Sequence, residues 1–507
     1  MQKQLWVIFG LVFAVLIAPA AAQGYMPEFF ETDCLFGDLN RVTCGVLVVP
    51  EDRANPDGNQ VELAVAIVAP ANGDFSQVPV IYLEGGPGGS AVLAADEFID
   101  HNIADTRELI LIDQRGTGFS FPSLNCFELE EDDENGTENC YNRLVSEGIN
   151  LSAYNSLESA ADIEDLRVTL GYDIVNIWGI SYGTRLGLTV LRQYPDSVNA
   201  AVLDSVFPPE INSLEDTAFD TADAFDIFLG ACASDATCSA NYPDLATTFE
   251  TLILDLNETP AVFQYDDGEE IFEFELFGDD VLGAMFQTLY NSSAIPMLPY
   301  GIELLATAQD DFDYTDGWDI IQGFYTPNTW LGFEEEIESS ANLIVAESDA
   351  VLDYFDEFGD ISDSEGMYTS VNCAEEVNLE DIDTAYNNAD TASDVIYNFV
   401  LNNIDGLVFD CDVWQVETAP ASEATRVQSD IPTLLISGGL DPVTPVAYGD
   451  SALEGLSNGV HVVFPFGGHS ETGARGCGGA ITAAFFDNPT TTPDTACIPQ
   501  DPGFYVE

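Results

Sequence analysis

A strand-to-helix turn is encoded at Trp178-Gly179-Ile180-Ser181-Tyr182-Gly183-Thr184. An apolar, β-branched run, residues 174–178, leads into this stretch, and a helical run, residues 184–193, leaves it. The stretch contains the pattern Gly-x-Ser-x-Gly, whose glycines allow a serine to sit on a tight turn with its hydroxyl exposed above a sheet. We therefore predict that Ser181 is a nucleophile. A purely structural turn is the alternative, and the groups that could activate the hydroxyl decide between the two.

Strand signals extend on both sides of this turn. Eight short runs of β-branched and apolar residues are bounded by turn residues: 45–49, 61–68, 78–83, 109–113, 174–178, 200–204, 433–437 and 460–464. From residue 78 onward the runs are almost continuously apolar, as expected of strands that helices cover on both faces. Helical patterns lie between them; one begins at a capping box of Ser159 and Asp162 and closes at Gly171. The sequence therefore predicts an α/β fold with a mostly parallel eight-stranded sheet.

A long insertion separates the sixth and seventh predicted strands. It covers more than two hundred residues, roughly 208–430, is rich in Asp, Glu, Phe and Tyr, and shows mostly helical patterns. Because the chain returns to β-strand afterwards, we predict a large, mainly helical cap inserted into the core rather than a second domain in tandem. The predicted organisation is a leader at 1–22, a core in two parts at 23–207 and 431–507, and a cap at 208–430.

The first 22 residues have the pattern of a secretory signal peptide. A short basic start at 1–4 is followed by an apolar run at 5–17 and by Ala20-Ala21-Ala22, which matches a small-residue cleavage site. A run of about 13 residues falls short of the roughly 20 that a membrane helix needs, so an uncleaved anchor is the weaker alternative. No other stretch of the sequence is long and apolar enough to cross a membrane. We expect the mature protein to be secreted or periplasmic, with no membrane contact after signal cleavage.

The cysteines agree with export, because disulfides persist in oxidising compartments. There are ten, an even number, and neighbours in the sequence fall into close couples. We predict five local disulfides: Cys34–Cys44, Cys126–Cys140, Cys232–Cys238, Cys373–Cys411 and Cys477–Cys497. A zinc site is the weaker alternative, because the sequence has no Cys-x-x-Cys and only three histidines. We expect no metal and no organic cofactor.

The charge is extreme: 89 acidic residues stand against 11 basic ones, which gives a formal net charge of −78, and Lys3 is the only lysine. A surface this negative repels phosphate backbones, so the sequence excludes nucleic-acid binding. The hydrophobic content of 46% is enough for a sizeable core and excludes a disordered chain. The acidic run at 130–134 is expected to be a solvated loop, because the ligand spacing of an EF-hand is missing.

A serine hydroxyl is a weak nucleophile and needs a base, normally an imidazole that a carboxylate orients. His101 precedes the serine in the chain, which is the wrong order, and His461 lies inside an alternating strand, where a structural role is expected. His469 follows the last strand in Gly467-Gly468-His469-Ser470, a glycine loop able to bring the ring over the serine. We therefore predict that His469 is the general base.

Asp441 is the predicted acid of the same site. It follows the seventh strand in a turn flanked by Gly and Pro, at 437–445, which suits a carboxylate that must hold an imidazole. An Asx-turn aspartate is the alternative. The order Ser181, Asp441, His469, with each residue just past a strand end, is that of the α/β-hydrolase fold.

A tetrahedral intermediate also needs backbone N–H groups to hold its oxyanion. We predict one donor at Tyr182, the residue after the nucleophile, and the other at Gly86 in the glycine-rich loop after the third strand.

Three further charges are predicted to be structural. Asp113 and Arg115 are expected to form a buried ion pair that braces the turn after the fourth strand. Asp204, after the sixth strand, is expected to be structural as well.

Three stretches, at 83–90, 113–120 and 178–184, resemble the proline-iminopeptidase and tripeptidyl-aminopeptidase branch of the α/β-hydrolases. The later Asp441-Pro442-Val443-Thr444-Pro445 and Gly467-Gly468-His469-Ser470 resemble the C-terminal segment of its secreted, tripeptidyl-aminopeptidase-like (TAP-like) members. The resemblance covers both ends of the catalytic core. It implies a serine exopeptidase that releases short N-terminal pieces from peptides.

The resemblance further implies that carboxylates of the cap hold the free α-ammonium group of the substrate. A buried cation needs a carboxylate partner, which gives this role its physical basis. Glu375 and Glu376 are our candidates, because the adjacent Cys373 can pin their segment beside the pocket. A solvated surface pair is the alternative.

The sequence as a whole therefore predicts an exported serine aminopeptidase that acts, through Ser181, His469, Asp441 and an acyl-enzyme, on peptides with a free N-terminus. A carboxylesterase or lipase with the same triad is the alternative, because acyl chemistry is shared. The complete triad disfavours a non-catalytic binding protein, and the serine at the turn disfavours enzymes with an aspartate nucleophile. The sequence makes no prediction of oligomeric state.

Overall fold

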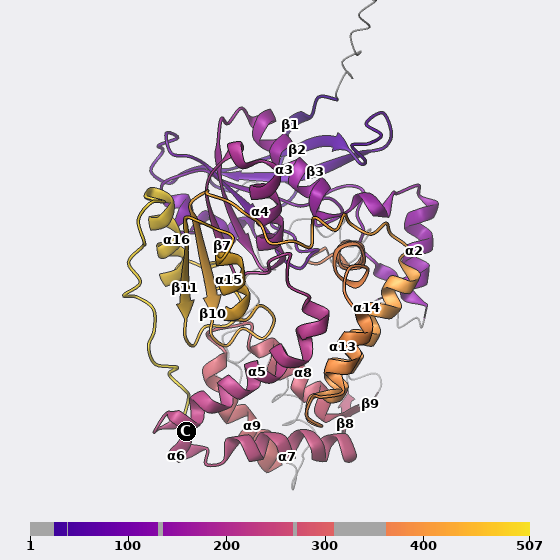
Figure 1. Ribbon diagram of the computed structural model, residues 1–507, viewed down its shortest axis with the longest axis vertical. Helices are drawn as coiled ribbons and strands as arrows, with labels where there is room; N and C mark the ends of the chain where they lie inside the picture. The colour runs from indigo at the N-terminus through magenta and orange to yellow at the C-terminus, as the bar shows by residue number, and fades with distance from the viewer. Residues whose placement is uncertain (1–24, 38, 130–134, 267–270, 309–360, 507) are drawn as a thin grey trace, which may run out of the picture.

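The computed structural model describes residues 25–37, 39–129, 135–266, 271–308 and 361–506 (Figure 1). The predicted signal peptide, residues 1–22, and the acidic run at 130–134 lie outside the described residues. No helix within the described ranges is both long and apolar enough to span a bilayer.

The core is a nine-stranded sheet with the strand order β1-β2-β3-β5-β4-β6-β7-β10-β11. Its strands are β1 (Glu28–Thr32), β2 (Val42–Pro50), β3 (Gln60–Val68), β4 (Val80–Leu83), β5 (Leu109–Ile112), β6 (Val175–Ile180), β7 (Val198–Asp204), β10 (Thr433–Gly438) and β11 (Gly459–Phe464). The first three neighbouring pairs, from β1 to β5, are antiparallel, and the other pairs are parallel. The eight predicted strands and the mostly parallel sheet are confirmed.

The ninth strand, β1, is an edge strand that the sequence pattern does not reveal. Its sequence, Glu-Phe-Phe-Glu-Thr, is short and polar, and four of its five residues are exposed. It pairs antiparallel with β2 and with no other strand of the described sheet. Because such a strand buries few side chains, it lacks the apolar run that marks the inner strands.

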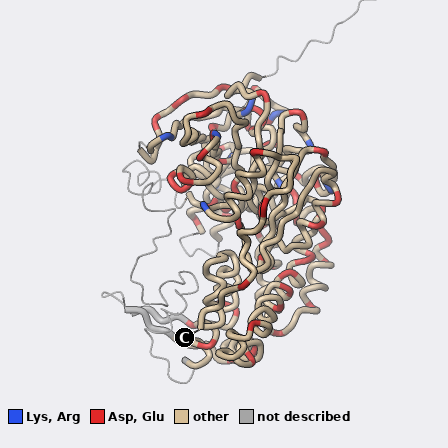
Figure 2. The backbone as a smooth tube through the Cα atoms, turned by 90° about the vertical axis from the view of Figure 1, so that its left-hand side faces the viewer, with Lys and Arg blue, Asp and Glu red and all other residues tan. Residues whose placement is uncertain are grey.

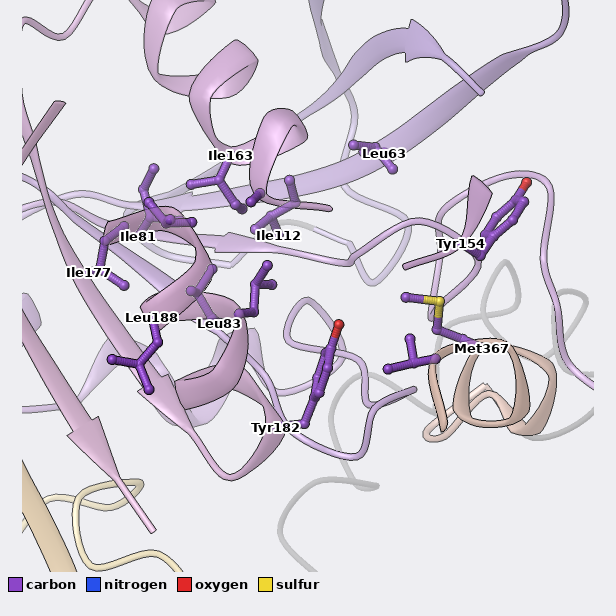
Figure 3. Close-up of a cluster of buried hydrophobic side chains, with 14 of the residues drawn as sticks. Leu63, Ile81, Leu83, Ile112, Tyr154, Ile163, Ile177, Tyr182, Leu188 and Met367 are labelled. Carbon is purple, nitrogen blue, oxygen red and sulfur yellow. The ribbon is translucent and has the colours of Figure 1, made fainter. Parts of the chain in front are cut away.

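The central strands are buried on both faces by helices. The helices that flank the sheet are α1 (Ala95–Ile99), α2 (Gly136–Ser146), α3 (Ser156–Leu170), α4 (Tyr182–Gln193), α15 (Val446–Leu453) and α16 (Cys477–Asp487). Successive strand side chains point to opposite faces. Ile81 and Ile177 pack with α3 and α4 on one face, as Figure 3 shows. Tyr82 and Trp178 pack with α1 and α16 on the other.

Helix α3 begins about one turn earlier than predicted. Its N-cap is Asn155, whose side-chain oxygen accepts a main-chain N–H at 3.0 Å. The predicted capping box of Ser159 and Asp162 is wrong, because both residues are buried within the helix. The predicted end is confirmed: Gly171 adopts a left-handed φ of 81° and closes the last turn.

Between β7 and β10 the described chain is mostly helical and forms the lower and right-hand parts of Figure 1. Its helices are α5 (Ser213–Ser234), α6 (Cys238–Asn241), α7 (Leu245–Glu258), α8 (Gly278–Thr288), α9 (Leu298–Ala308), α12 (Glu365–Asn372), α13 (Ile382–Ala389) and α14 (Tyr397–Val413). They enclose a hydrophobic cluster of their own, which includes Phe225, Ile253 and Leu282. An antiparallel hairpin, β8 (Ala261–Asp266) and β9 (Ile271–Leu276), accompanies them. We propose residues 208–430 as the extent of this cap.

The five predicted disulfides are all present, and none of the ten cysteines is free. Their Cα–Cα separations of 5.1 to 5.7 Å lie in the normal range for a disulfide. Cys373–Cys411 joins the end of α12 to α14, and Cys477–Cys497 ties the C-terminal stretch to α16. Such bonds are expected in a protein that folds in an oxidising compartment.

The predicted ion pair between Asp113 and Arg115 is wrong, although both residues are buried. Arg115 instead turns toward α3, where its Nε and Nη2 each lie 2.8 Å from a carboxylate oxygen of Asp162. Asp113 turns toward the loop after β4 and accepts the hydroxyl of Ser90 and the N–H of Val92, each at 2.9 Å. Arg115 therefore links the turn after β5 to α3, and Asp113 links the same turn to the loop after β4.

The ten arginines of the chain all bind within the protein. Nine form ion pairs with carboxylates, and Arg41 donates to main-chain carbonyl groups. No Lys or Arg occurs between Arg192 and Arg426, so Arg426 is the one basic residue of the sequence from 208 to 430. Figure 2 shows basic residues in the upper part of the molecule and acidic residues along its whole height.

This charge distribution predicts that salt stabilises the protein. Acidic side chains without cationic partners repel one another, and the Debye length falls from about 30 Å at 0.01 M to about 3 Å at 1 M ionic strength. We expect the melting temperature to rise steadily when NaCl is raised over this range. NaCl is preferred to a sulfate salt, which stabilises most proteins by exclusion from their surface. A melting temperature that stays flat contradicts the prediction.

Candidate active site

Ser181 lies on a sharp turn between β6 and α4, with its backbone at φ 54° and ψ −125°. A residue with a side chain rarely adopts this conformation. The two glycines of the motif allow the close packing that holds the turn. A Cβ on Gly183 would lie 2.0 Å from the carbonyl oxygen of Leu83, and one on Gly179 would lie 2.3 Å from that of Gly183. The turn thus places the serine at the C-terminal end of a central strand.

His469 and Asp441 form a hydrogen-bonded pair. Nδ1 of the imidazole lies 3.0 Å from Oδ1 and 2.9 Å from Oδ2 of the carboxylate. Asp441 also accepts the N–H groups of Val443 (3.0 Å) and Thr444 (2.9 Å) and the hydroxyl of Thr444 (2.6 Å). Burial opposes both charges, but their mutual attraction outweighs it. The pKa of His469 is therefore raised, and the pKa of Asp441 is lowered.

The loop that carries His469 is anchored to the end of β7 by Asp204. Its Oδ2 accepts the N–H of Glu471 at 2.8 Å, the N–H of Thr472 at 2.6 Å and the hydroxyl of Thr472 at 2.7 Å. Burial raises the pKa of Asp204 to about 6. These contacts agree with the structural role predicted for Asp204, and they fix the position of the imidazole relative to the sheet.

The other two histidines are held in the framework. His101 stacks on Trp178 with ring centroids 4.7 Å apart, and its Nε2 lies 2.9 Å from the main-chain oxygen of Thr472. Burial lowers the pKa of His101 to about 4, so this ring is neutral at pH 7. His461 lies on β11, with Nδ1 3.0 Å from Oδ1 of Asp450. Both rings contact groups other than Ser181, which leaves His469 as the candidate base.

A cavity of about 980 Å³ brings the predicted groups together. Ser181 and His469 line it, together with Gly85 and Gly86 of the loop after β4. The loop comes close to the serine: a Cβ on Gly85 would lie 2.9 Å from the Cβ of Ser181. From the cap, the ring of Tyr290 lies with its centroid 4.7 Å from that of His469. The cavity is therefore walled by both the core and the cap.

The lining of this cavity is acidic. Glu84, Glu97, Asp363 and Glu471 contribute carboxylates, and none of its described lining residues is Lys or Arg. Burial raises the pKa of Glu84, and it raises the pKa of Glu471 to about 7. The cavity therefore offers carboxylates to a cationic group, and His469 is the basic side chain among its described lining residues.

Glu375 and Glu376 lie elsewhere. Each is 3% exposed, and neither is among the described residues that line the cavity. Arg185 of α4 pairs with both: its Nε lies 3.2 Å from Oε2 of Glu375, and its Nη1 contacts Glu376. The predicted role at the ammonium group of a substrate does not fit this placement, because the carboxylates already have a buried cation. The alternative of a solvated surface pair is wrong for the same reason.

Sequence reasoning missed Thr444 and Tyr290. The Asp-Pro-Val-Thr spacing carries a signal for Thr444, because side chains of Asp commonly accept donors two or three residues further on. No local pattern marks Tyr290, whose place beside His469 depends on how the cap packs against the core.

Comparison with known proteins relates two regions of the chain to families. Residues 78–255 match the alpha/beta hydrolase fold family, and residues 398–497 match the family described as TAP-like protein. The serine protease Hip1 of Mycobacterium tuberculosis is 25% identical over 441 residues, which cover 80% of this chain and 77% of that protein. The tripeptidyl aminopeptidase of Streptomyces coelicolor is 29% identical over 214 residues, 35% of this chain and 39% of that protein. The proline iminopeptidase of Xylella fastidiosa is 30% identical over 129 residues, 25% of this chain and 32% of that protein.

The first matched region contains Ser181, and the second contains Asp441 and His469. The sheet order and the strand-end positions of these residues agree with both matches. The resemblance drawn from the sequence is thereby confirmed. The chain therefore contains an α/β-hydrolase domain, matched over residues 78–255, and a TAP-like region, matched over residues 398–497.

Proposed function

We propose that this protein is an exported serine aminopeptidase. One observation carries the proposal: a serine on a strained turn shares a cavity with an imidazole that is paired with a buried carboxylate. Ser181 is the nucleophile, His469 is the general base and Asp441 orients the base. The five disulfides support export, because such bonds persist in oxidising compartments.

The proposed steps use side chains and main-chain N–H groups of this chain, with water as the second nucleophile. Ser181 Oγ attacks the carbonyl carbon while its proton passes to Nε2 of His469, since Nδ1 faces Asp441. The N–H groups of Gly86 and Tyr182 hold the developing oxyanion. The C–N bond then breaks, and the imidazolium gives its proton to the leaving amine. Water, deprotonated by the same imidazole, attacks the acyl carbon. The ester bond to Ser181 Oγ then breaks, the imidazolium returns its proton to the serine, and the acid product leaves.

The acidic cavity supports a substrate with a free N-terminus. An α-ammonium group is a cation near neutral pH, and a hydrogen bond to a carboxylate is stronger than one between neutral groups. Glu84, Glu97, Asp363 and Glu471 line the cavity and take the place of Glu375 and Glu376 as the carboxylates that we propose near this group. The names of two relatives, a tripeptidyl aminopeptidase and a proline iminopeptidase, agree with this direction.

A carboxylesterase is the rival, because the same nucleophile cleaves esters. The test is hydrolysis of three matched chromogenic substrates: a tripeptidyl anilide with a free amine, its N-acetylated twin and a short-chain ester. We expect cleavage of the free-amine anilide, and a loss of kcat/KM for the acetylated twin. Ester turnover without anilide cleavage contradicts the aminopeptidase and favours the esterase. Equal cleavage of both anilides contradicts recognition of the amine.

The pH dependence follows from the His469–Asp441 pair. The base must be neutral to accept a proton, and its pKa is raised above the ordinary 6.5, so activity is lost as the pH falls through this raised value. We expect the acid limb of kcat/KM, which reports the free enzyme, to have an apparent pKa above 6.5 at 0.1 M salt. An apparent pKa at or below that of a free imidazole contradicts the prediction.

A further inference from the structure

One segment of the cap, which we call the bridging segment, comprises residues 361–377. It contains α12 and the π-helical turn η8 (Cys373–Val377). The proposed oxyanion donors come from two other parts of the chain, the loop after β4 and the first residue of α4. The bridging segment contacts both parts.

The first contact is with the glycine loop. Two main-chain hydrogen bonds, of 3.0 and 3.1 Å, pair residues 88–90 with residues 362–364 as a short antiparallel bridge. A Cβ at Gly88 would lie 2.4 Å from Oδ1 of Asp363, so this approach requires a glycine. The backbone just after Gly86 is therefore fixed by the bridging segment.

The second contact runs through the side chain of Tyr182. Glu375 accepts the N–H of Ser156 at 2.6 Å and the Ser156 hydroxyl at 2.7 Å. Because that hydroxyl donates to the carboxylate, its oxygen is the acceptor for the hydroxyl of Tyr182, 2.9 Å away. All three side chains are buried, so water does not compete with these bonds. The chain of donors has one direction, from Tyr182 through Ser156 to Glu375.

Arg185 holds Glu375 in place for this contact. It lies about one turn after Tyr182 on α4 and is fully buried. Its Nε lies 3.2 Å from the Glu375 carboxylate, and its Nη2 donates to the Glu375 carbonyl oxygen at 3.3 Å. The first turn of α4 and the bridging segment are thus joined by an ion pair and by the hydroxyl chain.

Apolar packing supports the same junction. Met367, Val371 and Cys373 of the bridging segment belong to the hydrophobic cluster that contains Tyr182. Figure 3 shows Met367 on its helix, at the side of the cluster that holds Tyr154 and Tyr182. The disulfide Cys373–Cys411 secures the segment to α14 within the cap.

We propose that the bridging segment sets the geometry of the oxyanion hole, with Glu375 and Ser156 as positioning residues that fix Tyr182. This inference rests on the proposed function. The N–H of Tyr182 belongs to the first turn of a helix, where main-chain N–H groups have no partner in the helix itself. The direction of this N–H group depends on where α4 begins. The buried side chain of Tyr182 fixes the position of that first residue. The cap thereby contributes to chemistry at groups that belong to the core.

The test is the pair of variants Ser156→Ala and Tyr182→Phe, each of which cuts the hydroxyl chain and keeps every main-chain N–H. Loss of one oxyanion donor costs about 10²- to 10³-fold in kcat, so a displaced donor is expected to cost about 10- to 100-fold. KM should stay unchanged. The affinity for a peptidyl trifluoromethyl ketone, which forms a tetrahedral oxyanion on the serine, should fall by the same factor as kcat.

The matched control is Thr189→Val. It also removes a buried hydroxyl, which donates to the Arg185 carbonyl within the same helix at 3.0 Å, but it leaves the bridging segment untouched. We expect a lower melting temperature and an unchanged kcat. Activities are compared well below the melting temperature of each variant, so loss of folded protein does not enter.

Failure of this inference can be distinguished from failure of the proposed function. If Ser156→Ala and Tyr182→Phe lower the melting temperature but keep kcat and the ketone affinity, the inference is overturned and the contacts are only structural. Labelling of Ser181 with a fluorophosphonate tests the proposed function separately. An unmodified protein that does not label contradicts the serine mechanism, whereas labelling with unchanged kinetics in both variants contradicts the oxyanion inference alone.

Discussion

Replacing Ser181 by alanine is expected to lower kcat by about 10⁵- to 10⁶-fold on the substrate that the unmodified protein prefers. Without the hydroxyl no acyl-enzyme forms, and only binding and the oxyanion donors remain to accelerate attack by water. The backbone at φ 54° is set by the neighbouring close contacts, so the variant should keep its fold and its melting temperature. Steady-state kinetics with highly purified variant, to exclude traces of active enzyme, measure the loss.

Ser146→Ala is the control, because this serine is exposed and lies outside the residues that line the cavity. It should keep the full rate. Labelling by a fluorophosphonate, followed by mass spectrometry, should modify Ser181 in the control and nothing in Ser181→Ala. An alanine variant that retains even a hundredth of the activity means that another group is the nucleophile.

Asp441→Asn is expected to lower kcat by about 10⁴-fold. In the unmodified protein the Asp441 carboxylate accepts the Nδ1–H of His469 at 2.9 Å. In the variant, an amide whose NH₂ group faces the ring donates to Nδ1. The ring proton of His469 then lies on Nε2, so Nε2 is not free to accept the proton of Ser181. The substitution preserves shape, so the cavity and KM should change little. Single-turnover kinetics should show slow acylation rather than slow release of product.

The control for this variant is Asp450→Asn, which alters the other carboxylate–imidazole pair of the protein. Oδ1 of Asp450 lies 3.0 Å from Nδ1 of His461, at the surface and away from the cavity. Its kcat should equal that of the unmodified protein. If both aspartate variants lose activity equally, the effect is one of net charge or stability and not of a catalytic pair.

The sheet could be predicted because its inner strands are covered on both faces. Such strands need nearly continuous apolar residues, and runs such as 78–83 and 174–178 satisfy this need. The edge strand β1 is not covered in this way, so it has no apolar run. The hairpin β8–β9 was not predicted because helical patterns dominate the stretch in which it lies. Strand β9 reads Ile-Phe-Glu-Phe-Glu-Leu, an alternation that favours a strand.

The site was only partly predictable, for a physical reason. Ser181, Asp441 and His469 each follow a strand end, so the topology of a parallel sheet carries them to one edge. Glu375 has no such guide. Its partner Arg185 is distant in the sequence, and the pairing exists only because the cap packs on α4. In a chain with 89 acidic residues, sequence does not distinguish a carboxylate that faces a cavity from one that faces a buried cation.

The placement of arginine has a consequence for digestion by other proteases. Trypsin-like proteases cut after Lys or Arg, and loops and exposed tips are where they find their sites. After Lys3 the chain has no lysine, and residues 193–425 contain no arginine. Such a protease therefore finds no cleavable bond in the part of the cap that precedes Arg426, even in a loop. Among the described residues its sites lie at arginines that bind carboxylates or carbonyl groups. We therefore expect trypsin-like proteases to leave residues 193–425 intact.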